Sequence, residues 1–233
     1  MTKPKVLILR AAGINRDQDA AQAVRMAGGE PTVVHIGQVV TGSVQVADYA
    51  MLIVPGGFSY GDHLGAGALL AMDLVQRIGD QVQRFVEDGR AVLGICNGFQ
   101  VLVKSGLLPG AQLAQRQASL THNASGRFEC RWVHLQAPTS HCIFTQGLTT
   151  TIEVPVAHGE GRFVMTDDAA LSQLHASGQV ALCYVDAAGQ PTTTYPANPN
   201  GSAHGIAGVC DASGRIMGMM PQTRIRVIDN DRL

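Results

Sequence analysis

A chain of 233 residues with a formal net charge of −1 has no basic excess, and this argues against a nucleic-acid-binding surface. Hydrophobic residues make up 45% of the chain and charged residues 15%, a composition typical of a globular protein rather than a disordered one. No apolar run approaches the length of a membrane span, and the first residues show no signal-peptide pattern. We therefore expect a cytoplasmic protein without a membrane anchor.

The first half of the chain alternates short apolar runs with helical patterns. This alternation predicts βαβ units, which form a parallel sheet with helices on both faces. The predicted strands are 5–9, 32–36, 49–54 and 91–95, and the predicted helices are 15–26, 65–88 and 98–104.

The second half changes character, because its apolar runs are separated by turns instead of helical patterns. Ala212-Ser213-Gly214 between two such runs predicts a hairpin, and the polar stretch 195–202 with its two prolines predicts a loop. Since no linker or repeat is visible, residues 1–233 are expected to form one domain. The predicted strands are 127–135, 152–156, 180–185, 205–210 and 215–220.

The cysteines do not form a recognisable disulfide or metal pattern. Five of them, an odd number without CxxC spacing, fit neither a disulfide framework nor a zinc site, and no metal is expected. Four lie in apolar surroundings, which is typical of buried and unreactive thiols. The exception is Cys96; the others are Cys130, Cys142, Cys183 and Cys210.

The strongest local signal is the segment Gly94-Ile95-Cys96-Asn97-Gly98, which follows an apolar strand and precedes a helical pattern. A nucleophile on a sharp turn between strand and helix forms a nucleophile elbow, here with Cys in place of Ser. The flanking glycines allow the sharp turn, so the side chain projects above the carboxyl end of the sheet. A helix N-terminus favours negative charge, which predicts a lowered pKa and a reactive thiolate at Cys96.

A second segment, Pro55-Gly56-Gly57-Phe58, also follows a predicted buried strand and should lie at the same sheet edge as Cys96. Paired glycines leave backbone N–H groups unshielded, as an oxyanion hole requires. An ordinary strand-to-loop turn would look the same. The segment alone leaves both interpretations open.

Six segments together resemble the glutaminase subunit of phosphoribosylformylglycinamidine synthase, a family of class I, triad-type glutamine amidotransferases. Other class I glutaminases share the cysteine elbow, whereas Phe-Ser-Tyr-Gly-Asp and Asn-Pro-Asn-Gly-Ser are characteristic of this subunit. The resemblance covers residues 5 to 221, nearly the whole chain. The segments that carry it are 10–17, 55–62, 94–100, 123–128, 156–163 and 198–202.

The resemblance implies a doubly wound, mostly parallel α/β fold of the flavodoxin-like type. It also implies hydrolysis of glutamine to glutamate and ammonia through a thioester on Cys96. The oxyanion hole would consist of the N–H groups of Gly57 and Asn97. The glutamine-binding positions would be Gly56, Gln100, Asn123, Ser125 and Phe128.

The same resemblance implies two protein partners. Ammonia would pass to a larger synthetase subunit, which uses ATP and Mg to convert formylglycinamide ribonucleotide to its amidine in de novo purine biosynthesis. A small accessory subunit would complete the complex. No cofactor is expected in the glutaminase subunit itself.

One segment departs from the family pattern. After Gly218-Met219-Met220-Pro221 the family reads His-Pro-Glu-Arg, whose His and Glu complete the triad, whereas this chain has Gln222 and Arg224 at those two positions. The Gln222 amide does not titrate near neutral pH and cannot act as a base. Arg224 would place a positive charge where a carboxylate should orient the imidazole.

Three interpretations of this departure are open. The tail is altered by a change of reading frame or a sequence error, the chain is a catalytically impaired scaffold, or another histidine supplies the base. His158 and His204 are the candidates for that role, although a surface facing the synthetase explains the first and a solvated loop the second more simply. Asp17, Asp62 and Glu160 are expected to be surface or interface carboxylates.

Overall fold

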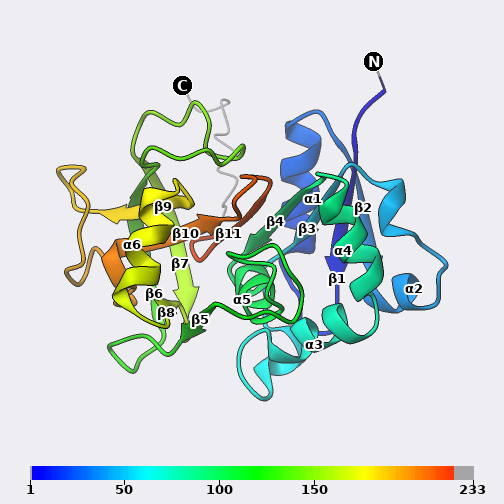
Figure 1. Cartoon of the computed structure of the whole chain (residues 1–233), viewed down its shortest axis with the longest axis horizontal. Helices are drawn as coiled ribbons and strands as arrows, with labels where there is room; N and C mark the ends of the chain where they lie inside the picture. The colour runs from blue at the N-terminus through cyan, green and yellow to red at the C-terminus, as the bar shows by residue number, and fades with distance from the viewer. Residues whose placement is uncertain (1, 223–233) are drawn as a thin grey trace, which may run out of the picture.

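Apolar strands from both halves of the chain combine into one nine-stranded sheet in the computed structural model, which describes residues 2–222 (Figure 1). The strand order is β2-β1-β3-β4-β11-β10-β9-β6-β7. The pairs from β2 to β11 are parallel, and the pairs from β11 to β7 are antiparallel. The sheet therefore has a parallel half and an antiparallel half, which meet at β11.

Helices cover both faces of the parallel half. Successive residues of a strand point to opposite faces, so the contacts of alternate residues show which helices lie on each face. On β1, Val6 and Ile8 pack in the same cluster as Ala21 of α1, whereas Leu7 and Leu9 pack in the large cluster that contains residues of α3, α4 and α5. This arrangement confirms the doubly wound α/β prediction. The strands are β1 (Lys5–Arg10), β2 (Glu30–His35), β3 (Met51–Val54), β4 (Ala91–Ile95) and β11 (Ile216–Met219). The helices are α1 (Asp17–Met26), α2 (Ile36–Val40), α3 (Ala68–Gln76), α4 (Gly79–Glu87) and α5 (Asn97–Lys104).

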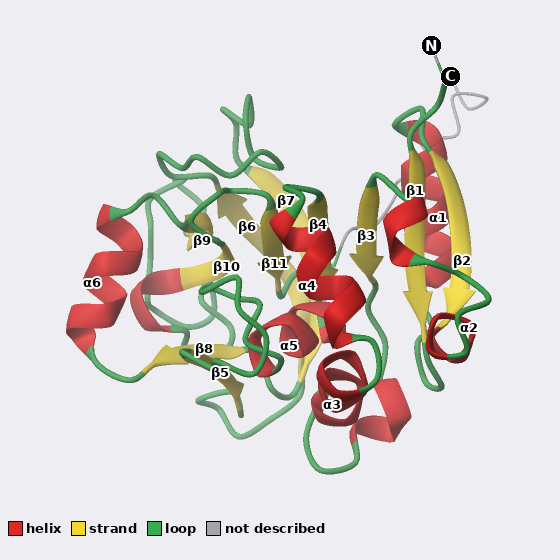
Figure 2. Ribbon diagram, turned by 45° about the vertical axis from the view of Figure 1, so that its right-hand side comes forward, coloured by secondary structure: helices red, strands yellow, loops and turns green. Residues whose placement is uncertain are grey.

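The antiparallel half carries a separate two-stranded ribbon, β5 with β8, and one helix, α6 (Figure 2). The ribbon packs against α5, where the rings of Phe99 and Phe163 stack with their centroids 6.2 Å apart. The predicted hairpin is present as the antiparallel pair of β10 and β11. The elements are β5 (Ala118–Thr121), β6 (Glu129–Gln136), β7 (Ile152–His158), β8 (Arg162–Met165), α6 (Asp168–Ala176), β9 (Val180–Val185) and β10 (Ile206–Cys210), with short 3-10 turns at Val46–Asp48, Ser59–Asp62 and Ala203–Gly205.

The prediction of one long helix over 65–88 is wrong, because the structure has two shorter helices there. Gly65 and Gly67 have φ angles of 104° and 74°, so the helix begins only at Ala68. The second break follows Gln76. Ile78 is buried and has a non-helical backbone, and the next residue, Gly79, is a poor helix former. The elements α2, β5, β8 and α6 were not predicted. Among the helices of residues 2–222, none has both the length and the apolarity that a membrane-crossing segment needs.

The first turn of α5 lies directly on β3. A Cβ atom placed on Gly98 would lie 1.8 Å from the Val54 carbonyl oxygen, and one placed on Gly94 would lie 2.7 Å from the Gly98 carbonyl oxygen. Both distances are far below van der Waals contact. Glycine is therefore required at both flanks of the turn that carries Cys96.

We predict that Gly98→Ala lowers the free energy of unfolding by about 3 kcal/mol or more, because the methyl group forces β3 away from α5. Gly28→Ala is the matched control, since Gly28 has a φ of 85° but nothing within 4 Å of the added atom. That substitution should cost only the left-handed backbone strain, about 1–2 kcal/mol. Equal losses in denaturant titrations would contradict the steric argument.

Candidate active site

Cys96 occupies the turn between β4 and α5 in a conformation that side-chain-bearing residues rarely adopt. Its φ and ψ are 52° and −107°, and its side chain is 4% exposed. Strained backbone of this kind concentrates at functional sites. The nucleophile-elbow geometry predicted from the sequence is present.

The parallel strands β4 and β11 both end beside Cys96. The Cys96 N–H donates to the Met219 carbonyl at 2.8 Å, which ties the turn to the end of β11. Three residues later, the Gln222 N–H donates to the Pro155 carbonyl of β7 at 2.8 Å. The Gln222 side chain then donates through Nε2 to the Cys96 sulfur at 3.6 Å.

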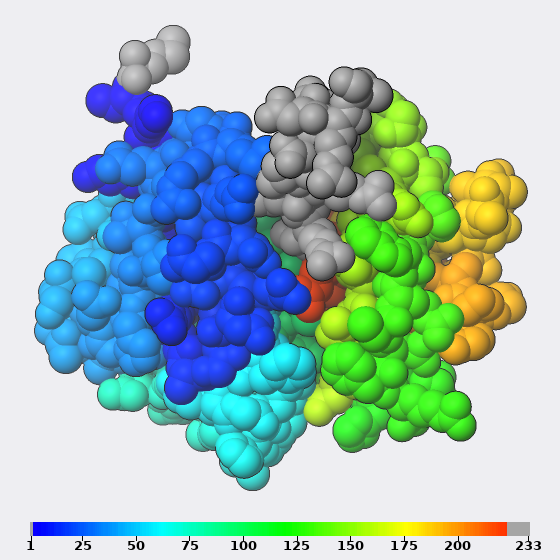
Figure 3. Space-filling view, turned by 180° about the vertical axis from the view of Figure 1, so that it is seen from behind, coloured from blue at the N-terminus to red at the C-terminus, as the bar shows by residue number. Residues whose placement is uncertain are grey.

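Gln222 thus sits beside the nucleophile, in the place predicted for the family's His. In the view from behind, the red end of the described chain lies between the blue N-terminal segments and the green segments of the antiparallel half (Figure 3). Arg224, at the position of the family's Glu, lies outside the described residues.

The thiol of Cys96 is harder to ionise than the sequence predicted. Its pKa is raised to about 11, chiefly by burial and in part by the nearby Asp62 carboxylate. The Asn97 backbone N–H and the Gln222 amide stabilise the thiolate but do not offset the loss of hydration. The predicted lowering of the pKa by the helix N-terminus is therefore wrong for the chain alone, and Cys96 is a neutral thiol near pH 7.

A cavity of about 150 Å³ opens onto Cys96, enough for a few water molecules at about 30 Å³ each. Of the two predicted oxyanion-hole residues, Gly57 forms part of the wall, whereas Asn97 does not line the cavity and its backbone N–H faces the Cys96 sulfur. The Cys96 thiol also approaches the Ala157 carbonyl at 3.8 Å. The cavity is lined by Gly57, Phe58, Asp62, Ala66, Cys96, Gln100, Phe128, Ala157, His158, Gly159 and Glu160.

The five predicted glutamine-binding residues have different positions. Gln100 and Phe128 line the cavity, and Gly56 lies behind Cys96, where an added Cβ would be 3.5 Å from that of the cysteine. Asn123 does not line it: its buried amide donates to the carbonyls of Arg127 and His158, both at 2.8 Å. Ser125 is exposed and lines a different cavity.

The two candidate replacement bases differ sharply. His204 is exposed, packs against the ring of His175 at 5.2 Å between centroids, and does not line the Cys96 cavity. His158 does line it and is 3% exposed, so its side chain is not on the surface predicted to face a partner. Burial lowers the pKa of His158 to about 4. Its Nδ1 lies 3.2 Å from the Asn123 Oδ1, and its Nε2 has no hydrogen-bond partner in the described structure.

The three carboxylates expected to be surface or interface groups are all at least partly buried. Asp17 is 6% exposed and pairs with Arg10 at 3.7 Å. Asp62 and Glu160 are half-buried and line the Cys96 cavity. No local pattern marks these two residues beyond their place in glycine-rich segments, because their proximity depends on how β7 meets the end of β3.

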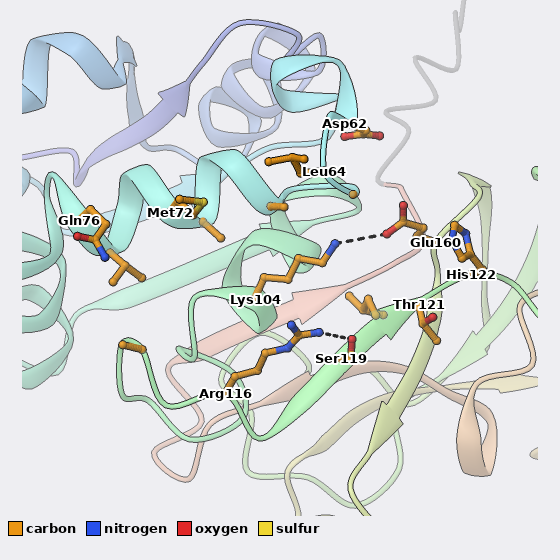
Figure 4. Close-up of a pocket in the computed structure, with 16 residues that line it drawn as sticks. Asp62, Leu64, Met72, Gln76, Lys104, Arg116, Ser119, Thr121, His122 and Glu160 are labelled. Carbon is orange, nitrogen blue, oxygen red and sulfur yellow. Dashed lines mark hydrogen bonds and ion pairs between the residues drawn. The ribbon is translucent and has the colours of Figure 1, made fainter.

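A larger cavity of about 760 Å³ adjoins the first and shares Asp62 and Glu160 with it (Figure 4). Its lining is mixed: the apolar residues include Leu120 and the exposed Leu64 and Met72, and the charged residues include Lys104 and Arg116. In Figure 4, Lys104 points at Glu160, and Arg116 donates to Ser119.

The other thiols only partly match expectation. Cys130 is exposed, not buried as predicted. Cys142 and Cys210 are buried and hydrogen-bonded to each other, a pairing that their sequence separation hides. Among residues 2–222 there is no cluster of three or more groups that could hold a metal ion.

Comparisons with known proteins agree with this geometry. Residues 3–230 match the model of the CobB/CobQ-like glutamine amidotransferase domain. The match runs past Pro221, where the resemblance seen in the sequence stopped. The chain is 45% identical to phosphoribosylformylglycinamidine synthase subunit PurQ of Treponema denticola, over 99% of this chain and 91% of that protein. It is 43% identical to the PurQ subunit of Methanococcus maripaludis C5, over 94% and 81%.

Solved structures extend the comparison. The structure of PurLQS from Thermotoga maritima matches with a TM-score of 0.74 and 35% identity, over 95% of this chain and 88% of that chain. A glutamine amidotransferase from the same organism matches with a TM-score of 0.57 at 14% identity, over 95% and 76%, which shows a shared fold alone.

We predict that alkylation of Cys96 by iodoacetamide accelerates about tenfold per pH unit between about pH 7 and pH 10, because the thiolate fraction rises by that factor below the pKa. The measurement uses Cys130→Ser protein and peptide mapping, so that the exposed thiol does not consume the reagent. Cys96→Ala provides the blank. A rate that is already level at about pH 8 would contradict the raised pKa.

Proposed function

Because the chain belongs to the CobB/CobQ-like glutamine amidotransferases and, among them, to the PurQ subunits of phosphoribosylformylglycinamidine synthase, we propose that it is the glutaminase subunit of that enzyme in de novo purine biosynthesis. It would hydrolyse glutamine and supply ammonia to an ATP- and Mg-dependent synthetase subunit, needing no cofactor of its own. With this role we expect a cytoplasmic location. The observation that carries the proposal is Cys96 on a strained elbow, with Gly57 in the wall of its cavity and the Asn97 N–H facing its sulfur.

The chemistry follows from these groups. The Cys96 sulfur attacks the side-chain carbonyl carbon of glutamine, and the N–H groups of Gly57 and Asn97 stabilise the negative charge that develops on the oxygen. The C–N bond then breaks, ammonia leaves, and water hydrolyses the thioester to glutamate. Two proton transfers accompany acylation: one leaves the thiol, and one reaches the departing nitrogen.

Those proton transfers are the weak point of this chain. Gln222 donates a hydrogen bond to the sulfur but neither accepts the thiol proton nor delivers one. Of the two histidines considered, only His158 lines the cavity, and its lowered pKa of about 4 makes it a poor base. We infer that turnover is slow in this chain. The scaffold hypothesis is the limiting case, in which the complex assembles without turnover.

The synthetase subunit would cover the mouth of the cavity. Phe58 and Phe128 line this cavity and are 46% and 54% exposed, and Leu64, on the adjoining cavity, is 83% exposed. Exposed apolar residues gathered around a site are typical of an interface. A partner seated there would also shield the cavity from bulk solvent. We propose that a small accessory subunit joins the same complex.

The first prediction concerns the missing base. Replacing Gln222, Thr223 and Arg224 by His, Pro and Glu should raise glutamine hydrolysis in the presence of the synthetase by about 10²- to 10⁴-fold, the usual contribution of a positioned acid–base group. Ammonia release is measured, with Cys96→Ala as the blank. If the unmodified chain is equally fast, another base operates, and His158→Ala is the next variant because His204 lies elsewhere.

The second prediction concerns the partner. Leu64→Asp should weaken binding to the cognate synthetase by about tenfold or more, because it places a charge in the proposed apolar contact. Met26→Asp is the matched control, since Met26 is 68% exposed but lines neither cavity. Analytical ultracentrifugation with glutamine and nucleotide present measures both. Equal effects of the two variants would place the interface elsewhere.

A further inference from the structure

The charged side chains that line the Cys96 cavity are both acidic. Asp62 and Glu160 contribute carboxylates, and no Lys or Arg of the described chain lines this cavity. The amide of Gln100 is already engaged, because its Nε2 donates to the Glu160 carbonyl at 2.7 Å and its Oε1 accepts from Asn97 at 3.0 Å. The wall around the nucleophile is therefore rich in acceptors.

Of the two carboxylates, Glu160 is already neutralised. Its Oε2 pairs with the Lys104 ammonium at 3.3 Å, and its carboxylate accepts from the Ala66 N–H at 3.2 Å (Figure 4). The Lys104 ammonium also donates to the Ala66 carbonyl at 2.6 Å, which fixes it on that side of the cavity. This cation therefore pairs with Glu160, although its charge also lowers the pKa of Asp62.

Asp62 makes no ion pair of this kind within residues 2–222, and the Lys104 charge stabilises it only from beyond ion-pair distance. Its Oδ1 accepts from the Asn97 amide at 3.2 Å, and its carboxylate accepts from the Gly67 backbone N–H. Burial and the neighbouring Glu160 both raise its pKa, which reflects a negative charge without full compensation. A cation placed beside Asp62 would relieve this cost.

His158 lines the same cavity and carries a ring nitrogen without a partner among residues 2–222. Because the Asn123 Oδ1 can only accept, the His158 Nδ1 must carry the proton of that hydrogen bond, and Nε2 keeps a free lone pair. The His158 Nε2 is buried and has no partner in the described structure. A buried acceptor without a partner is costly unless a ligand donor satisfies it.

The backbone that presents Asp62 is strained. Tyr60, Asp62 and Leu64 have φ angles of 55°, 55° and 63°, in the left-handed region that residues with a side chain rarely adopt. The Tyr60 hydroxyl, which donates to the Asp73 carboxylate at 2.5 Å, anchors the segment to α3. Strain held in place by such contacts is characteristic of ligand-binding segments.

We propose that Asp62 is the specificity residue for the α-ammonium group of the glutamine substrate, with the His158 Nε2 as a second acceptor. An ammonium group has three N–H donors and one positive charge, which match a carboxylate that makes no ion pair within residues 2–222 and an unpaired ring nitrogen. The inference rests on the proposed glutaminase function and deepens it. It explains how a glutaminase distinguishes free glutamine from a glutamine within a peptide, whose α-nitrogen is uncharged.

Asp62→Asn gives opposite results with two reagents for Cys96. The Asp62 charge raises the pKa of Cys96, so its removal should increase the thiolate fraction and speed alkylation by the neutral reagent iodoacetamide. The same variant should slow labelling by diazo-oxo-norleucine, which carries an α-ammonium, by about 10- to 150-fold, the usual effect of losing a hydrogen bond to a charged group. Misfolding would change both rates in one direction.

The experiment uses Cys130→Ser chains in complex with the synthetase, and peptide mapping reports Cys96. Asp62→Glu, which keeps the charge, should recover part of the diazo-oxo-norleucine rate. Asp48→Asn, an exposed residue that lines neither cavity, is the control and should change neither rate. Protection of Cys96 by glutamine, compared with N-acetylglutamine, is measured on the same samples.

Three outcomes decide between the claims. Opposite changes in Asp62→Asn, with glutamine protection lost, support the inference. Equal glutamine protection in wild-type and Asp62→Asn chains overturns it while the glutaminase function stands. If glutamine does not protect Cys96 even in the wild-type complex, the proposed function fails and the inference fails with it.

Discussion

The parallel pairing of β11 with β4 is the constraint on which the site depends. Met219 lies opposite Ile95 in this register, and the Cys96 N–H continues the ladder by donating to the Met219 carbonyl. Because both strands run in the same direction, whatever follows Met219 must emerge beside whatever follows Ile95. A sequence change just after β11 therefore acts directly on the nucleophile, although the two positions are more than one hundred residues apart in the chain.

Burial of Cys96 is the second constraint. The strand pairing positions the thiol for attack, whereas burial disfavours its reactive thiolate form. The cavity that shields the reacting atoms from water also disfavours the thiolate, raising the pKa of Cys96 from 9.0 to about 11. At about 1.4 kcal/mol per pKa unit, this amounts to about 3 kcal/mol of lost thiolate stability. An imidazole beside the sulfur would offset that cost, because an imidazolium partner favours the charged form. The Gln222 amide supplies only a dipole, so the altered residue removes an electrostatic contribution as well as a proton acceptor.

Local sequence pattern predicts some parts of the molecule. Short stretches of sequence are enough to predict three features that the structure has: the elbow at Cys96, the glycine turn at Gly57 and the alternating strands of the first half. The position of Gln222 beside Cys96 is predicted from its spacing after β11 alone. The predictions that fail concern contacts between distant segments. The pKa of Cys96 is raised because β7 helps to bury the thiol. The hydrogen bond from Asn123 to the His158 carbonyl forms only when the antiparallel half folds against the loop after β5. The cavity position of Asp62 depends likewise on left-handed turns that no periodicity reveals.

We infer that Cys96 is correctly placed but lacks a group to move its proton. Rapid mixing of the chain and its synthetase with glutamine, followed by acid quench and intact mass measurement, tests this claim at the first chemical step. We expect Cys96 to remain a free thiol over many seconds. A γ-glutamyl thioester should appear only in the chain with His, Pro and Glu at positions 222–224. Rapid accumulation of the thioester in the unmodified chain would contradict it.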